Sequence, residues 1–97
     1  MSKLYRTAVE GGLKLSPLWD DEAVVFNPAS AEIFVVTESA ARLLKAVQDH
    51  AVPVPVADLA AQLQMEPPFH ASAGLQDEIE SMLLELEHLG FIESALP

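Results

Sequence analysis

The sequence has no cysteine, only four glycines and no long apolar run. Without cysteine there are no disulfides, no thiolate catalysis and no cysteine-ligated zinc or iron–sulfur sites, so a cytoplasmic location is the default expectation. No uncharged apolar run reaches the roughly 18 residues that a membrane span requires. The scattered glycines form no phosphate-cradling loop. We therefore expect a cytoplasmic protein with no membrane-spanning segment.

Positive charge is almost absent from the second half of the chain. Residues 1–45 contain six acidic and five basic residues, whereas residues 46–97 contain nine acidic residues and no lysine or arginine. Nucleic-acid binding depends on lysine and arginine that neutralise phosphates, so a DNA or RNA partner is disfavoured, as is an anionic membrane. A basic or apolar polypeptide is compatible with this charge. Simple solubility is the plainer interpretation of it.

Residues 22–44 contain the strongest local signals. Residues 23–26 and 32–36 are rich in β-branched and aromatic residues and predict two strands, joined by a turn at residues 27–30. Thr37 is a good N-cap for a helix over residues 38–49. No third strand follows the second one directly, so its outer edge is a candidate free sheet edge.

The rest of the chain predicts one more strand and two more helices. A short strand at residues 13–15 precedes the pair, and helices are expected at 56–64 and 75–89, the last stopped by Gly90. The expected fold is α+β: an N-terminal three-stranded antiparallel sheet followed by a three-helix winged helix-turn-helix-like bundle. We expect residues 1–12 to be a flexible lead-in, 13–93 to be a single domain and 94–97 to be a tail.

The third predicted helix is acidic outside one apolar arc. It has five carboxylates and no base, whereas a DNA-reading helix would present basic or amide side chains to the groove. Its apolar arc contains six residues: Leu75, Ile79, Met82, Leu83, Leu86 and Leu89. Glu78 and Glu85 lie on one flank of the arc. This helix is therefore not expected to read DNA.

No group of residues predicts catalysis or metal binding. The three histidines lie in separate segments without ligand spacing, and the adjacent carboxylates of residues 20–22 lack the spaced ligands of a calcium loop. The serines show no nucleophile elbow. We expect neither an enzyme nor a cofactor or metal site.

Several of these segments together resemble one known family. A Trp-Asp-Asp-Glu-Ala-Val-Val-Phe run from Trp19, a Thr-Glu-Ser-Ala-Ala-x-Leu-Leu helix start from Thr37 and a Leu-Glu-x-Leu-Gly-Phe-Ile ending from Leu86 are combined over residues 13–93. The combination resembles the PqqD-like family, or RiPP recognition elements, which bind ribosomally made peptides that are later modified. The first run is similar to the subgroup found beside HPr-kinase-related proteins. That subgroup usually has glycine at the position of Ala31 and Thr-His within the following strand, where this sequence has Ile33-Phe34.

The resemblance implies a non-catalytic peptide chaperone. Such proteins bind the leader of a precursor peptide as an added strand and present its core to a maturation enzyme. The alternative from the residues is a winged-helix-type protein–protein adaptor, or a homodimeric regulatory module that pairs its own edge and does not bind DNA directly. Carried onto this sequence, the peptide-binding residues would be Glu32, Ile33, Phe34, Val35, Val36, Glu78, Met82 and Glu85.

Overall fold

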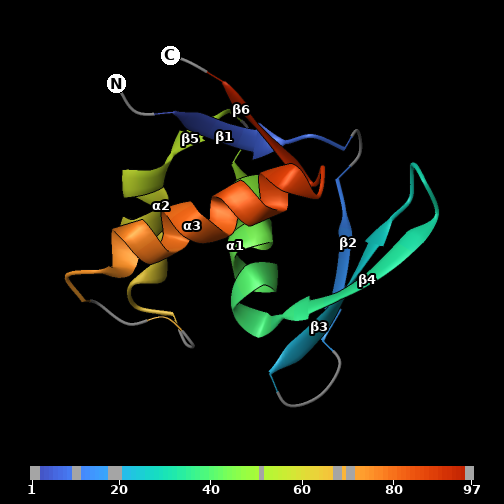
Figure 1. The fold of residues 1–97 in the computed structure, drawn as a ribbon, viewed down its shortest axis with the longest axis horizontal. Coiled ribbons are helices and arrows are strands. Elements are labelled where there is room, and N and C mark those ends of the chain that lie inside the picture. Colours follow the sequence, from blue (N-terminus) through green and yellow to red (C-terminus); the bar gives the residue numbers. More distant parts are fainter. Residues whose placement is uncertain are drawn as a thin grey trace.

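The described residues form two small antiparallel sheets and three helices, a fold of the α+β class (Figure 1). This computed structural model describes residues 3–9, 12–17, 21–50, 52–66, 69 and 72–95. In chain order the elements are β1 (Leu4–Thr7), β2 (Lys14–Pro17), β3 (Glu22–Asn27), β4 (Glu32–Thr37), α1 (Glu38–Asp49), β5 (Val54–Pro55), α2 (Val56–Leu63), α3 (Leu75–His88) and β6 (Ile92–Ala95).

The hairpin sheet has the order β2–β3–β4 and confirms the predicted three-stranded antiparallel sheet. Asn27 makes the turn between β3 and β4: its carbonyl accepts the N–H of Ala31 (2.7 Å) and its Oδ1 accepts that of Ala29 (3.0 Å). Ala31 has φ 61°, the left-handed conformation that glycine adopts without steric cost. The turn is therefore closed by local hydrogen bonds, although alanine occupies its left-handed position.

The hairpin leads directly into α1, at the predicted residue. The Thr37 side chain accepts a hydrogen bond from the N–H of Ala40 (3.2 Å), which satisfies one of the free donors of the first turn. Glu38 follows in the first turn, where a negative charge interacts favourably with the helix dipole. Because no loop separates β4 from α1, the end of the strand is fixed rigidly to the helix.

The end of α3 is also as predicted and reverses the chain. Gly90 has φ 85°, and the N–H of Phe91 donates to the carbonyl of Leu86 (3.1 Å) while that of Gly90 donates to Glu87 (3.0 Å). This hydrogen-bond pair is the Schellman arrangement, which satisfies the last carbonyls of a helix. It directs Phe91 back into the core, where it is 1% exposed.

The core lies between the three helices and the inner face of the hairpin sheet. In Figure 1, α3 crosses in front of α1, and the hairpin sheet lies to the right of both. All three helices bury an apolar stripe, as their sequence periodicity predicts. No helix in the described residues is long and apolar enough to cross a membrane. The fully buried residues from these helices and the hairpin are Val25, Leu43, Leu44, Val47, Leu59, Leu63, Ile79 and Leu83.

The structure also has a second sheet, of order β5–β1–β6, which the sequence did not predict. Two strands of this terminal sheet cross the predicted domain boundaries: β1 lies inside the expected lead-in of residues 1–12, and β6 extends into the expected tail of 94–97. Tyr5 of β1 is only 2% exposed, so this segment is anchored in the core. Strands β1 and β6 pair although they lie near opposite ends of the sequence, and no local pattern predicts such a pairing.

Candidate functional site

Strand β4 is an edge strand without the features that usually protect sheet edges. In the described part of the chain it pairs only with β3, in an unbroken register without a bulge. Natural edges are blunted by charged side chains, lysine above all, by proline or by very short strands. The other edge strands have such features: β2 contains Lys14 and Pro17, β5 has two residues including Pro55, and β6 contains Glu93. Among the edge strands of the described residues, β4 is the longest and its single charge is Glu32 at its start, so its edge is the least protected.

The ladder between β3 and β4 determines which backbone groups face this edge. The N–H of Glu38 donates to the carbonyl of Asp21 (2.6 Å), and hydrogen-bonded pairs alternate along an antiparallel ladder. Phe34 and Val36 therefore bond to β3, whereas the N–H and C=O groups of Ile33 and Val35 point away from it. These four groups are the ones that an added strand would use.

The side chains of β4 divide between two faces. Phe34 and Val36 are half-buried and pack against the core, and the Phe34 ring meets that of Phe91 edge-on with centroids 4.9 Å apart. Ile33 and Val35 lie on the outer face and are 67% and 58% exposed. The strand is therefore fixed from the inside and presents apolar side chains to solvent on the outside.

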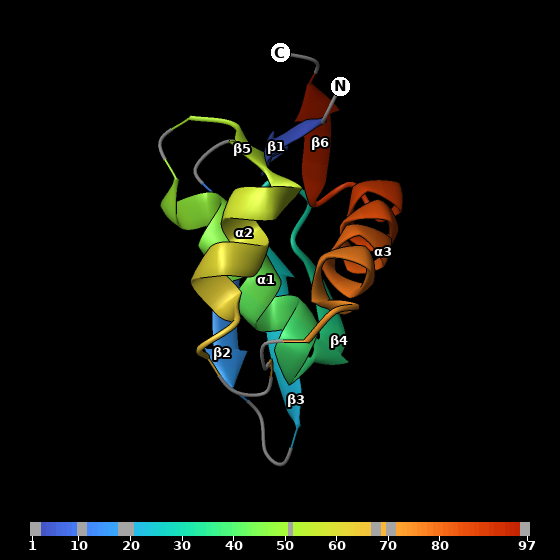
Figure 2. The same ribbon diagram turned by 90° about the vertical axis from the view of Figure 1, so that its left-hand side faces the viewer.

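An apolar groove of about 570 Å³ separates the end of β4 from the second half of α3. Figure 2 shows α3 and β4 on the same side of the molecule. Among the groove residues, Leu84 and Leu89 are exposed by 48% and 51%, a large fraction for leucine in a small domain. The groove is lined by Val36, Thr37 and Ala40 on one wall and by Leu84, Glu85, Leu86, His88 and Leu89 on the other.

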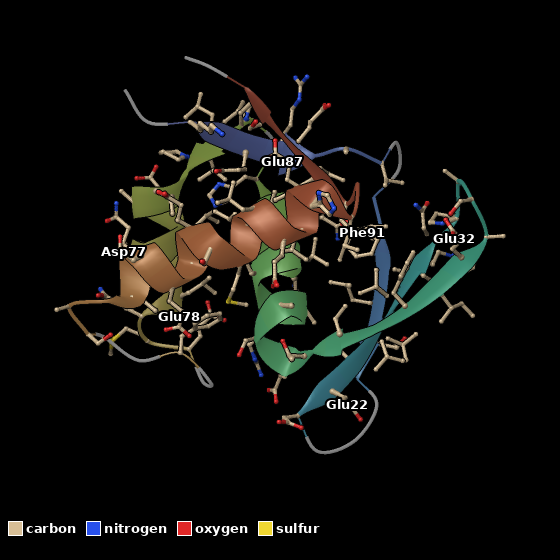
Figure 3. The ribbon with its side chains drawn as sticks, in the orientation of Figure 1. Glu22, Glu32, Asp77, Glu78, Glu87 and Phe91 are labelled. Carbon is tan, nitrogen blue, oxygen red and sulfur yellow. The ribbon has the colours of Figure 1, made fainter. Side chains whose placement is uncertain are left out.

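The predicted site residues do not all lie at this groove. Val36 and Glu85 line it, but Glu78 is exposed nearer the start of α3, and Met82 packs against the core. Glu32 lies at the turn end of β4, away from α3 (Figure 3). The structure thus brings part of the predicted strand and one predicted carboxylate together at a single groove.

The opposite flank of α3 faces the terminal sheet. The Ser94 hydroxyl donates to Glu87 Oε2 (2.6 Å). Burial raises the pKa of the Tyr5 phenol, and the nearby carboxylates of Glu87 and Glu80 raise it further. Glu87 and Glu80 therefore interact with the terminal sheet, whereas Glu85 on the other flank lines the groove.

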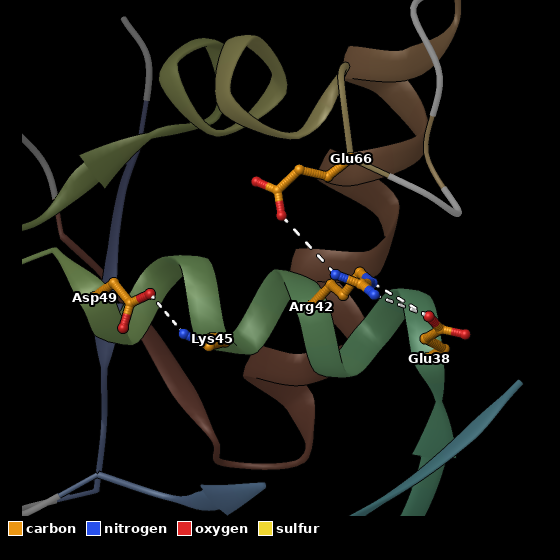
Figure 4. Close-up of polar contacts among 5 residues, drawn as sticks. All are labelled: Glu38, Arg42, Lys45, Asp49 and Glu66. Atoms are coloured by element: carbon orange, nitrogen blue, oxygen red, sulfur yellow. Dashed lines mark hydrogen bonds and ion pairs between the residues drawn. The ribbon is translucent and has the colours of Figure 1, made fainter. Parts of the chain in front are cut away.

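Most of the basic side chains already have acidic partners. Arg42 bonds to Glu38 (3.1 Å) and lies 3.9 Å from Glu66, while Lys45 pairs with Asp49 at 3.2 Å (Figure 4). Arg6 of β1 pairs with Glu93 at 2.8 Å. Within the described residues, neither Glu78 nor Glu85 forms an ion pair. The groove flank of α3 therefore carries negative charge that no ion pair among the described side chains neutralises.

The described parts of the chain contain no cluster of three or more histidine, aspartate or glutamate side chains that could hold a metal ion. His88 lines the groove, and His50 Nε2 lies 3.0 Å from Gln62 Oε1. Trp19, Asp20 and His70, which the sequence analysis considered, lie outside the described residues. Of these two histidines, only His88 lies at the groove, whose lining is mostly apolar.

Most of the α3 wall differs from the sequence-based expectation. The predicted buried arc included Leu89 but not Leu84, and both residues line the groove. Leu89 follows the last residue of α3, where the chain leaves the helix and the side chain no longer follows the buried stripe. An apolar residue off the arc of an otherwise acidic helix is the signal that could have identified Leu84.

Comparisons with protein-family models, curated proteins and solved structures give no match to this chain.

Proposed function

We propose that this chain is a non-catalytic, PqqD-like peptide-binding module of the cytoplasm. It binds the leader of a ribosomally made precursor peptide as an added strand on β4 and presents that peptide to a modifying enzyme. The observation that carries this proposal is the unprotected edge of β4 beside an apolar groove. The sequence motifs favour a leader peptide as the ligand, and the free edge favours strand addition as the mode of binding.

Strand addition explains how so small a surface can bind a peptide. Backbone hydrogen bonds to Ile33 and Val35 supply affinity independently of sequence, and side-chain pockets supply selection. Each such bond contributes only about 0.5–1.5 kcal/mol net, so the groove must contribute as well. Apolar burial at about 25 cal/mol per Å² does so when a large side chain enters between Ala40 and Leu84.

The charge of α3 favours a leader with lysine or arginine near the groove. Glu85 lines the groove, and Glu78 lies two helical turns before it on the same flank. An exposed ion pair is worth about 0–1 kcal/mol, so this preference adjusts affinity and does not create it. The acidic helix also argues against DNA as a ligand.

The three helices support a winged helix-turn-helix-like bundle. The order α1, β5, α2, α3, β6 alternates helices and short strands as in that architecture. Here β6 pairs with β1, from the opposite end of the chain. The partner of β6 is therefore β1, a strand anchored in the core, and the two do not form a projecting wing. This arrangement suits a role in protein–protein recognition.

A homodimeric or adaptor role is the second candidate, because the same free edge of β4 also fits a second copy. The two candidates differ in solution size. A peptide module stays monomeric and binds leader peptides, whereas a dimer that pairs β4 with β4 is larger and has no free edge. Sedimentation with and without peptide separates them.

Titration with fluorescent leader peptides tests the proposal. Leaders encoded in short reading frames beside the gene are added to the protein, and anisotropy is followed at low and moderate salt. One leader is expected to bind saturably, and its affinity should fall with rising salt because part of it is electrostatic. Absence of saturable binding by every leader would contradict the proposal.

Two charge-neutralising variants provide a matched control. Glu85→Gln, at the groove, should weaken a lysine-containing leader by up to about fivefold and reduce its salt dependence. Glu80→Gln, on the flank near Tyr5, should leave affinity unchanged. Equal effects from the two variants would indicate general charge attraction and not contact at the groove.

A further inference from the structure

The outer face of the hairpin sheet changes from polar to apolar toward the free edge. Two rows of side chains cross this face: one runs from Lys14 through Phe26 to Ile33, the other from Ser16 through Val24 to Val35. Both begin with an exposed polar residue on β2, continue with half-buried apolar residues on β3 and end with exposed apolar residues on β4. The apolar surface is thus greatest at the open edge.

This gradient distinguishes two ways of covering the face. A partner lying flat over the whole sheet would also cover Lys14, whose ammonium is costly to desolvate without a partner. A strand added beside β4 would lie next to Ile33 and Val35 only and leave β2 in water. The gradient therefore favours an occupant that arrives at the edge.

An added strand presents its side chains to both faces in turn. Residues beside Phe34 and Val36 point toward the groove, and those beside Ile33 and Val35 point to the outer face. If the ligand were apolar only toward the groove, its outward residues would be polar and would leave Ile33 and Val35 without apolar neighbours.

We propose that β4 reads its ligand on both faces, so that the ligand is an extended segment with consecutive apolar residues flanked by basic ones. This inference rests on the proposed function and specifies its ligand. The inward residues occupy the groove, the outward residues pack beside Ile33 and Val35, and a flanking lysine or arginine lies near Glu85. A second copy of this chain fits less well, because each copy has a net charge of −10.

Three capped eight-residue peptides test the proposal, with two lysines at each end and four varied central positions. The centres are all valine, alternating valine and threonine, or all threonine. Threonine has nearly the shape and β-propensity of valine, so the series changes polarity alone. An alternating peptide can place its valines toward the groove by shifting one residue, so a single alternating peptide suffices.

The all-valine peptide should bind about 2- to 30-fold more tightly than the alternating one, because two outward pairs are gained. The double variant Ile33→Thr/Val35→Thr should remove this difference and leave the alternating peptide unaffected. The control variant Leu84→Gln, at the groove, should weaken both peptides. This combination of results would support two-faced reading.

Three other results would overturn it. Equal binding of the all-valine and alternating peptides would mean that only the groove selects, while the proposed function stands. Binding of leader peptides without binding of any designed peptide would also reject this ligand class and leave the function intact. A wild-type dimer that the double variant dissociates, with no peptide bound, would assign the face to a second copy and reject the function as well.

Discussion

Proline at two neighbouring positions of β4 should have different effects: one should reduce stability and the other should reduce peptide binding. Phe34→Pro is expected to destabilise the protein by roughly 3 kcal/mol or more, because it removes a ladder hydrogen bond to β3 and the ring that packs on Phe91. Val35→Pro should change stability by only about 1 kcal/mol, because the Val35 N–H faces the open edge, where proline is tolerated. The Val35 variant should nevertheless lose at least about tenfold in peptide affinity.

Urea denaturation followed by circular dichroism measures the first effect, and peptide anisotropy measures the second. Val35→Thr is the control, since it keeps the N–H and nearly the same shape and should lose no more than about fivefold in affinity, from one apolar pair. If Val35→Pro unfolds the protein as Phe34→Pro does, the assignment of edge-facing groups is wrong. If Val35→Pro folds and binds normally, the ligand does not add to β4.

Truncation of Phe91 should cause a large loss of stability. Phe91 is 1% exposed, fixed by the Schellman turn and in edge-on contact with Phe34. Phe91→Ala should cost about 3–5 kcal/mol, a large part of the 5–15 kcal/mol typical of a small domain. We expect its Tm to fall by more than about 10 °C. Because Phe91 supports the inner face of β4, the Phe91→Ala variant should also bind peptide more weakly.

Leu89→Ala is the matched control for this substitution. Leu89 is two residues away in the chain but 51% exposed at the groove, so its truncation should change stability by no more than about 1 kcal/mol. It should weaken binding of an apolar peptide instead. Similar stability losses from both variants would show that Leu89 belongs to the core and that the groove is closed in solution.

The local signals of the sequence predict the parts of the fold that are determined locally. Thr37 starts α1 and Gly90 ends α3 where expected, because capping depends on a few adjacent residues. The terminal sheet depends on Tyr5 meeting Ser94 and Val54 from distant parts of the chain. Its three strands have only two to four residues each, too few for a clear alternation.

The candidate site likewise has one part that the sequence can suggest and one part that it cannot. The free edge of β4 follows from the order of the strands and helices, so the sequence alone could suggest it. The α3 wall of the groove depends on how the helix lies across the sheet, which no periodicity specifies. Glu78 and Met82 were therefore placed at the site by resemblance, whereas Leu84 and Leu89 line the groove. Val36 of β4 and Glu85 of α3, which the resemblance also implied, line the groove with them.

Amide hydrogen exchange along β4 tests the central claim most directly. In the free protein the amides of Phe34 and Val36 should be protected, because they bond to β3, while those of Ile33 and Val35 should exchange rapidly from a vacant edge. Saturating leader peptide should slow Ile33 and Val35 to the level of their neighbours. Protection of Ile33 and Val35 in the free monomer, or no change in them when peptide binds, would contradict the account.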